Sequence, residues 1–83
     1  MNNKTYVPPK QTMEKIEILF RSKTNIFVGT LAVEIGYSLL KTEMIIDHLI
    51  DKRVLRYATP QEAKALGFDE TYQILIKTSN QSL

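Results

Sequence analysis

Apolar residues recur at helical spacing near the start of the chain, with charged residues on the opposite side. The pattern predicts a helix over residues 12–22, with Thr12 as its N-cap. Residues 26–28 form a short apolar run, which predicts an edge strand or an extended connector. The residues of the apolar side are Met13, Ile16, Leu19 and Phe20.

Two further helices are predicted on either side of Gly36. Thr30 can cap a helix that runs to residue 35, and Gly36 can end it, because glycine adopts left-handed backbone conformations without a Cβ penalty. Ser38 can then cap a third helix over residues 39–52. A connection this short requires the two helices to cross at a steep angle.

The remaining pattern predicts two strands around a small helix. Residues 54–57 are strand-like, and Thr59, Pro60 and Glu62 form the signature of a capped helix that Gly67 would close. Residues 71–77 alternate as a strand does. The alternation places Tyr72, Ile74 and Ile76 on one side, and Gln73, Leu75 and Lys77 on the other.

These elements fit one domain. The chain has 83 residues, of which 43% are hydrophobic and 24% charged, a balance typical of a globular protein. We expect a flexible arm over residues 1–11, where Pro8 and Pro9 favour extended backbone, a domain over residues 12–78, and a polar tail over residues 79–83. Long apolar runs and a secretion signal are absent, so we expect a cytoplasmic protein without a membrane segment.

The region around Gly36 resembles the winged helix-turn-helix superfamily. Residues 27–38 carry the resemblance, with small Ala32 where two helices touch and Gly36 at the turn. Apolar residues continue it at Ile45, Ile46, Leu49, Val54 and Leu55. The resemblance implies an α+β fold with a three-helix core, a small antiparallel sheet and, here, a short extra helix in the wing connection.

The same resemblance implies a function. Members of this superfamily most often bind double-stranded DNA as transcription regulators, frequently as dimers, with the third helix in the major groove. On this basis we expect groove contacts from Ser38, Lys41 and Met44, helped by Tyr37 and Leu40. Phosphate contacts are expected from Thr30, Lys23 and Arg56, because cations and hydroxyl groups bind phosphate oxygens. The net charge of +2 permits a nucleic-acid partner without requiring one.

The outer face of the third helix supports an alternative partner. Helical projection places Leu40, Met44, Asp47 and Asp51 outward, and apolar side chains ringed by acids are typical of protein interfaces. The wing connection is also acidic, with Glu62, Asp69 and Glu70 against Lys64. A protein–protein adaptor is therefore the alternative function. The inward side of the helix is predicted to hold Leu39, Thr42, Ile46, Leu49 and Arg53.

Catalytic or cofactor chemistry has little support in the sequence. The chain has no cysteine and a single histidine, His48, and it lacks nucleotide-binding, hydrolase and metalloprotease motifs. We expect no enzyme activity, no cofactor and no metal. A chain this small offers few contacts to DNA, so a homodimer is expected, with Ile18, Val33 and Ile50 as candidate contacts.

Overall fold

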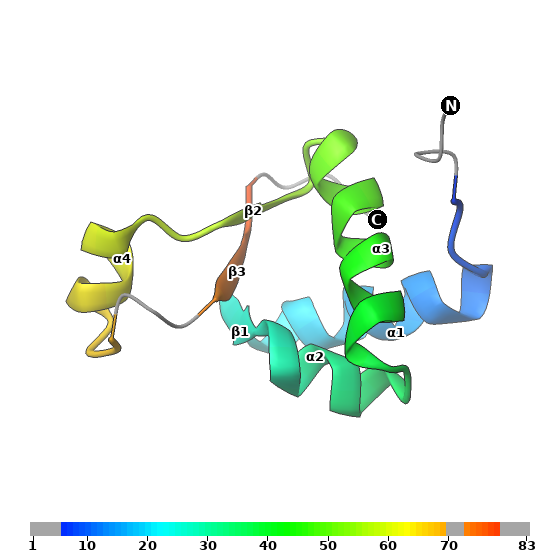
Figure 1. The fold of residues 1–83 in the computed structure, drawn as a ribbon, viewed down its shortest axis with the longest axis horizontal. Helices are drawn as coiled ribbons and strands as arrows, with labels where there is room; N and C mark the ends of the chain where they lie inside the picture. Colours follow the sequence, from blue (N-terminus) through cyan, green and yellow to red (C-terminus); the bar gives the residue numbers. More distant parts are fainter. Residues whose placement is uncertain (1–5, 70–72, 79–83) are drawn as a thin grey trace.

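The computed structural model describes residues 6–69 and 73–78, and these form an α+β fold. The elements follow one another in the predicted order, which is compatible with a winged-helix-like core (Figure 1). The short extra helix in the wing connection is present. The elements are α1 (Lys10–Ser22), β1 (Asn25–Phe27), α2 (Val28–Ile35), α3 (Leu39–Asp51), β2 (Leu55–Tyr57), α4 (Pro60–Ala65) and β3 (Ile74–Lys77).

One hydrophobic core joins the three long helices to the sheet. α3 stands across α2, as the short turn at Gly36 requires, and α1 runs behind both (Figure 1). Each of these elements contributes at least one side chain that is almost fully buried, which confirms the predicted core positions in α2 and α3. These side chains are Ile16 of α1, Leu31 and Ile35 of α2, Ile45, Ile46 and Leu49 of α3, Leu55 of β2 and Leu75 of β3.

The sheet has the antiparallel order β1-β3-β2, so β1 is an edge strand, as predicted. The predicted alternation puts Ile74 and Leu75 on opposite sides of β3, but it did not predict that both sides are covered. Ile74 and Leu75 are both buried. Because successive residues of a strand point to opposite faces, β3 is covered on both faces at this point. Tyr72 lies outside the described residues.

Two predicted helix starts were wrong. α1 begins at Lys10, directly after the extended residue Pro9, so the arm is shorter than residues 1–11. α2 begins at Val28, and Thr30 lies in its first turn instead of capping it. The N–H of Val28 donates to the carbonyl oxygen of Gln73 at 3.1 Å, so the backbone leading into β3 takes the place of a side-chain cap.

The end of the arm that the structure describes packs on the domain. Pro8 is buried, and Tyr6 lies against the core cluster. The flexibility of the arm stays a prediction. Residues 1–5 and the predicted polar tail, residues 79–83, lie outside the described residues.

Three helices end in the same hydrogen-bonded turn, each on a residue in the left-handed conformation. At the end of α2, Gly36 has φ 77°, and the N–H of Tyr37 donates to the carbonyl of Ala32 at 3.1 Å. Gly67 ends α4 in this way with φ 89°, as predicted. The same turn follows α3, with Arg53 in the left-handed conformation at φ 62°. The sequence did not predict this turn, because no glycine stands there. Arg53 is exposed, not on the inward side of α3.

Side-chain caps begin α3 and α4 as predicted. The hydroxyl oxygen of Ser38 accepts from the N–H of Lys41 at 3.1 Å. Thr59 and Glu62 form a reciprocal capping box, in which each side chain accepts a backbone N–H of the other residue. Three residues, Gly36 to Ser38, separate α2 from α3, and the turn that they form sets the direction of α3.

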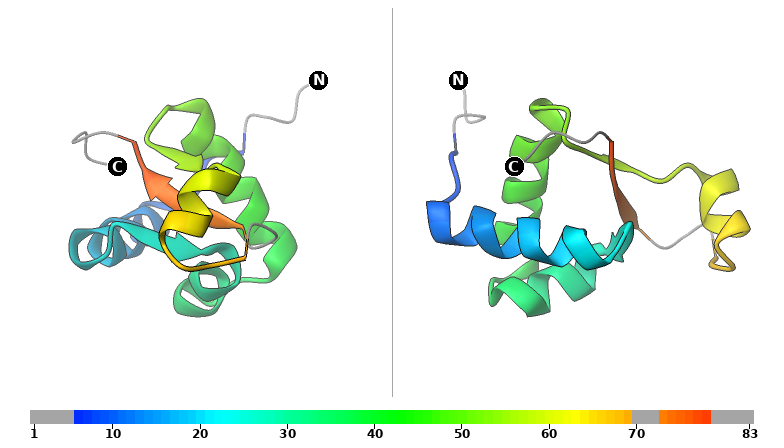
Figure 2. Two further views of the ribbon diagram at one scale, coloured as in Figure 1. Left: turned by 90° about the vertical axis from the view of Figure 1, so that its left-hand side faces the viewer. Right: turned by 180° about the vertical axis from the view of Figure 1, so that it is seen from behind.

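The wing extends away from the helical body. α4 lies at the far end of the connection between β2 and β3 and stands apart from α1 and α3 (Figure 2). The rings of Phe27 and Phe68 meet edge to face, with centroids 4.9 Å apart, and join the wing to the end of β1.

The left-handed helix ends predict opposite effects of two substitutions. Gly36→Ala should lower the free energy of unfolding by about 1 kcal/mol, because alanine is strained at this φ although its Cβ would meet no atom within 4 Å. Arg53→Gly should raise it by about 0.5 kcal/mol, because relief of strain exceeds the added entropy of the unfolded chain. Urea unfolding measures both changes. Equal effects of the same sign would contradict this account.

Candidate functional site

The leading half of α3 exposes apolar side chains. Leu40 is 72% exposed and Met44, one turn later, is 42% exposed, as the projection of the helix predicted. Leu39 is 53% exposed, so its predicted inward position was wrong. Leu39 precedes Thr42, the first buried residue of α3, and it therefore extends beyond the packed core.

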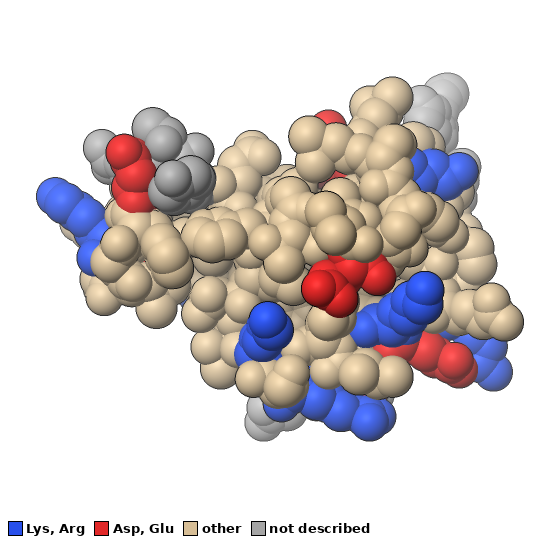
Figure 3. All heavy atoms as spheres, turned by 90° about the horizontal axis from the view of Figure 1, so that it is seen from below, with Lys and Arg blue, Asp and Glu red and all other residues tan. Residues whose placement is uncertain are grey.

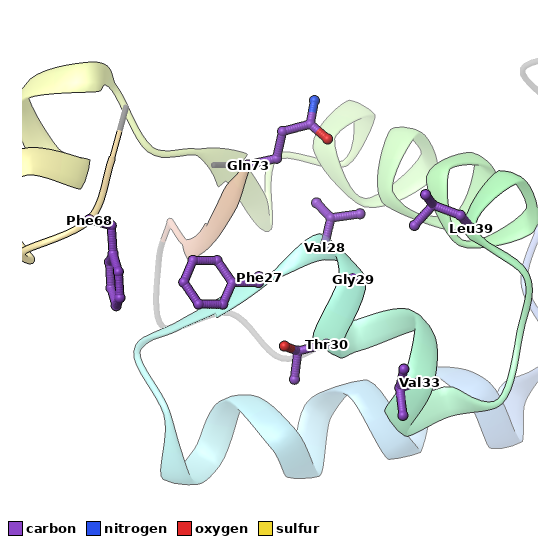
Figure 4. A pocket seen from close by; sticks show the side chains of 8 residues that line it. All are labelled: Phe27, Val28, Gly29, Thr30, Val33, Leu39, Phe68 and Gln73. Atoms are coloured by element: carbon purple, nitrogen blue, oxygen red, sulfur yellow. The ribbon is translucent and has the colours of Figure 1, made fainter. Parts of the chain in front are cut away.

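An open groove of about 910 Å³ lies beside the first turn of α3, between α2 and the wing. Val28 and Val33 of α2 and Leu39 of α3 line the helical side, and Phe68 and Gln73 line the wing side (Figure 4). Val33 is 77% exposed. The lining is completed by Phe27, Gly29 and Thr30, so no residue that lines the groove is charged.

The charged side chains lie mainly elsewhere. In Figure 3 uncharged atoms occupy most of the surface between the wing, at the left, and the helical body. The visible Lys and Arg atoms of the body gather mostly over the lower half, where α1 lies. A ligand that approaches the groove therefore meets an uncharged surface first.

Two residues predicted at the leading end of α3 have contacts within the domain. The Nζ of Lys41 lies 5.2 Å from the centre of the Tyr6 ring, in a cation–π contact with the arm. The hydroxyl groups of Tyr37 and Thr12 are 2.9 Å apart and share a hydrogen bond, so Tyr37 is half-buried against α1. Lys41 remains exposed on the side of α3 that faces the arm.

Arg56 on β2 is engaged by the wing helix. Its guanidinium group donates to both carboxylate oxygens of Glu62, at 2.7 and 2.8 Å. This pair, helped by the N–H of Thr59, lowers the pKa of Glu62 from 4.5 to about 2 and raises the pKa of Arg56. The charge of Arg56 is thus neutralised by a fixed partner.

An acidic flank runs along the wing side of α3. Glu43 lies one turn after Leu39 on the same side of the helix, and Asp47 lies one turn further. Tyr57 at the end of β2 is near both: burial, followed by the charges of Asp47 and Glu43, raises the pKa of its phenol. In the part of the chain that the structure describes, neither carboxylate forms an ion pair.

The predicted site residues therefore fall into separate groups. Ser38, Leu40, Lys41 and Met44 lie together on the leading half of α3, with Tyr37 beside them. Thr30 faces the groove from α2, Lys23 is exposed just after α1, and Arg56 is tied to α4.

Sequence reasoning did not identify the groove. Phe27 and Val33 could have been identified as surface apolar residues, because both belong to apolar runs that are longer than a small core needs. Phe68 and Gln73 carried no such signal, since they reach the groove through the fold of the wing. The contact between Tyr6 and Lys41 likewise depends on the path of the arm.

Comparison with known proteins identifies no relative: no protein-family model, curated protein or solved structure matches the chain. Across residues 6–69 and 73–78, no helix has the length and apolar content needed to span a membrane. The same residues hold no group of three His, Cys, Asp or Glu side chains arranged to bind a metal ion. Function must therefore be inferred from the fold and the surface.

The Arg56–Glu62 pair predicts a specific pH dependence of stability. Because folding lowers the pKa of Glu62, the pair stabilises the protein above about pH 4.5, and this contribution is lost as the pH falls towards about 2. Glu62→Gln keeps a capping side chain but removes the charge. Urea unfolding at several pH values should show that acidification lowers the free energy of unfolding less in Glu62→Gln than in the wild type. Glu14→Gln should match the wild type. An unchanged acid profile for Glu62→Gln would contradict the role of the pair.

Proposed function

We propose that this protein is a winged-helix-like domain that binds another protein through the leading half of α3 and the adjoining groove. The observation that carries the proposal is the chemistry of the exposed side chains there. Leu39, Leu40 and Met44 are apolar, and Glu43 and Asp47 beside them are acidic. Exposed apolar groups that lie together beside charged ones are typical of surfaces that a protein partner covers.

These same side chains are poorly suited to read DNA. Bases are read mainly by Arg, Lys, Asn, Gln, Ser and Thr, and phosphates repel carboxylates. Lys41 is the one Lys or Arg of α3, and Arg56 is paired with Glu62. A duplex in contact with α3 would therefore place its phosphates close to Glu43 and Asp47 with little basic compensation.

Binding of double-stranded DNA is the second candidate, and one observation favours it. Ser38 and Lys41 lie exposed at the leading end of a helix that stands across its predecessor, where a recognition helix meets the major groove. In this role the protein would be a small cytoplasmic transcription regulator, and a homodimer would supply the contacts that one copy lacks. Ile18 and Val33 are exposed and available for such an interface, whereas Ile50 is half-buried against the core.

Site-specific photo-crosslinking in the native host cells tests the proposal. A benzophenone amino acid in place of Leu40 should give discrete adducts with protein, because this position is at the centre of the proposed surface. The same amino acid in place of Ile18, an equally apolar and 59% exposed residue of α1, should give far weaker adducts. Mass spectrometry of the adducts identifies what is bound.

Adducts at position 40 that disappear on nuclease treatment would contradict protein binding and support DNA. A duplex titration at two salt concentrations then provides an independent measurement. A DNA-binding protein should lose affinity steeply as salt rises, and Lys41→Ala should reduce the magnitude of the logarithmic slope by about 1. The proposed protein-binding role predicts no such binding to the duplex.

A further inference from the structure

The groove has an uncharged lining, and the acidic flank of α3, here called the acidic wall, lies outside that lining and adjoins it at Leu39. Val28, Val33 and Leu39 form an uncharged surface, and the acidic flank of α3 continues from Leu39 through Glu43 to Asp47. The ends of the strands bring the wing side to the same place, since Phe27 pairs with Ile74 in the sheet. One ligand can therefore contact the lining and the acidic wall together.

The acidic wall has no compensating cation within the described part of the chain. Glu43 and Asp47 are exposed and form no ion pair there, and after burial their charges contribute to the raised pKa of the Tyr57 phenol. Lys41, the one Lys or Arg of α3, lies on the arm side over the Tyr6 ring. The field at this wall is thus negative, and it favours a cationic neighbour.

We infer that the groove binds a short segment of a partner protein in which apolar side chains adjoin Lys or Arg. This inference rests on the proposed protein-binding function and adds the chemistry of the partner. The apolar side chains would lie over Val28, Val33 and Leu39, and the cations would face Glu43 and Asp47. The volume of about 910 Å³ lies within the range of about 300–1,000 Å³ that accommodates a compact ligand, so a few side chains fit.

A second copy of this chain is a different occupant that has some of the same chemistry. α1 exposes Ile18 near Lys15 and Arg21, although Glu14 and Glu17 also adjoin it and Arg21 pairs with Glu17 at 4.0 Å. If α1 of one copy docked into the groove of another, the two contacting surfaces would be different. Copies would then add one after another and form open chains of increasing mass. Concentration-dependent assembly would therefore distinguish this occupant from a separate partner.

Selection from a library of displayed random peptides on the immobilised full chain tests the inference. Selected peptides should combine apolar residues with an excess of Lys and Arg over Asp and Glu. Against the best peptide, Glu43→Lys combined with Asp47→Lys should weaken binding about tenfold, because two exposed charge pairs are lost. Glu14→Lys on α1, also exposed, should change it less than about twofold, and Val33→Arg should abolish binding by filling the groove.

Each other outcome has a defined meaning. Selected peptides that are acidic or uncharged, and that Val33→Arg still blocks, would overturn the inferred chemistry and leave the proposed function in place. Failure to select any peptide, or peptides indifferent to Val33→Arg, would overturn both. Light scattering that shows assembly of the wild type, lost in Val33→Arg, would assign the groove to a second copy and overturn the inferred partner.

Discussion

The turn between α2 and α3 is the constraint on which the rest of the structure depends. Gly36 ends α2 in a left-handed conformation, and Ser38 begins α3 with a side-chain cap two residues later. This short connection fixes α3 across α2, so that Ile45, Ile46 and Leu49 enter the core. It also leaves the first turn of α3 beyond that core. Leu39 and Leu40 are exposed as a consequence of the same turn that organises the buried residues.

Two basic side chains that were expected to bind DNA, Arg56 and Lys41, have partners within the described part of the domain. The guanidinium group of Arg56 is paired with Glu62 of the wing helix, and the Nζ of Lys41 lies over the ring of Tyr6 in the arm. What remains towards the wing is an uncharged groove, with the carboxylates of Glu43 and Asp47 further along α3. The fold alone is compatible with several kinds of ligand, so the side chains at this surface are the better guide to function.

Much of the fold could be predicted from local signals in the sequence. The Gly36 turn, the Ser38 cap and the capping box of Thr59 and Glu62 depend on residues within four positions of one another, and all are confirmed. One error arose where distant backbone took part. α2 starts at Val28, whose N–H donates to the distant residue Gln73, so Thr30 lies within the first turn instead of capping the helix.

The candidate site was partly predictable for the same reason. The spacing of Leu40, Met44 and Asp47 on one helix shows that they share an outer face, and the structure confirms that Leu40, Met44 and Asp47 are exposed. The groove could not be predicted, since Phe27, Val33, Leu39 and Phe68 come together only when β1, α2, α3 and the wing are assembled. Pairing of Arg56 with Glu62 likewise depends on how α4 folds back towards β2.

The central claim is that the turn at Gly36 leaves an apolar surface open in the free protein. Methyl NMR with a soluble paramagnetic agent measures this most directly. The account predicts strong relaxation enhancement for the methyl groups of Val33, Leu39 and Leu40, and protection for those of Leu31 and Leu49, which are buried. Equal protection of both sets at low protein concentration would show that the surface is covered within the monomer, and would contradict the account.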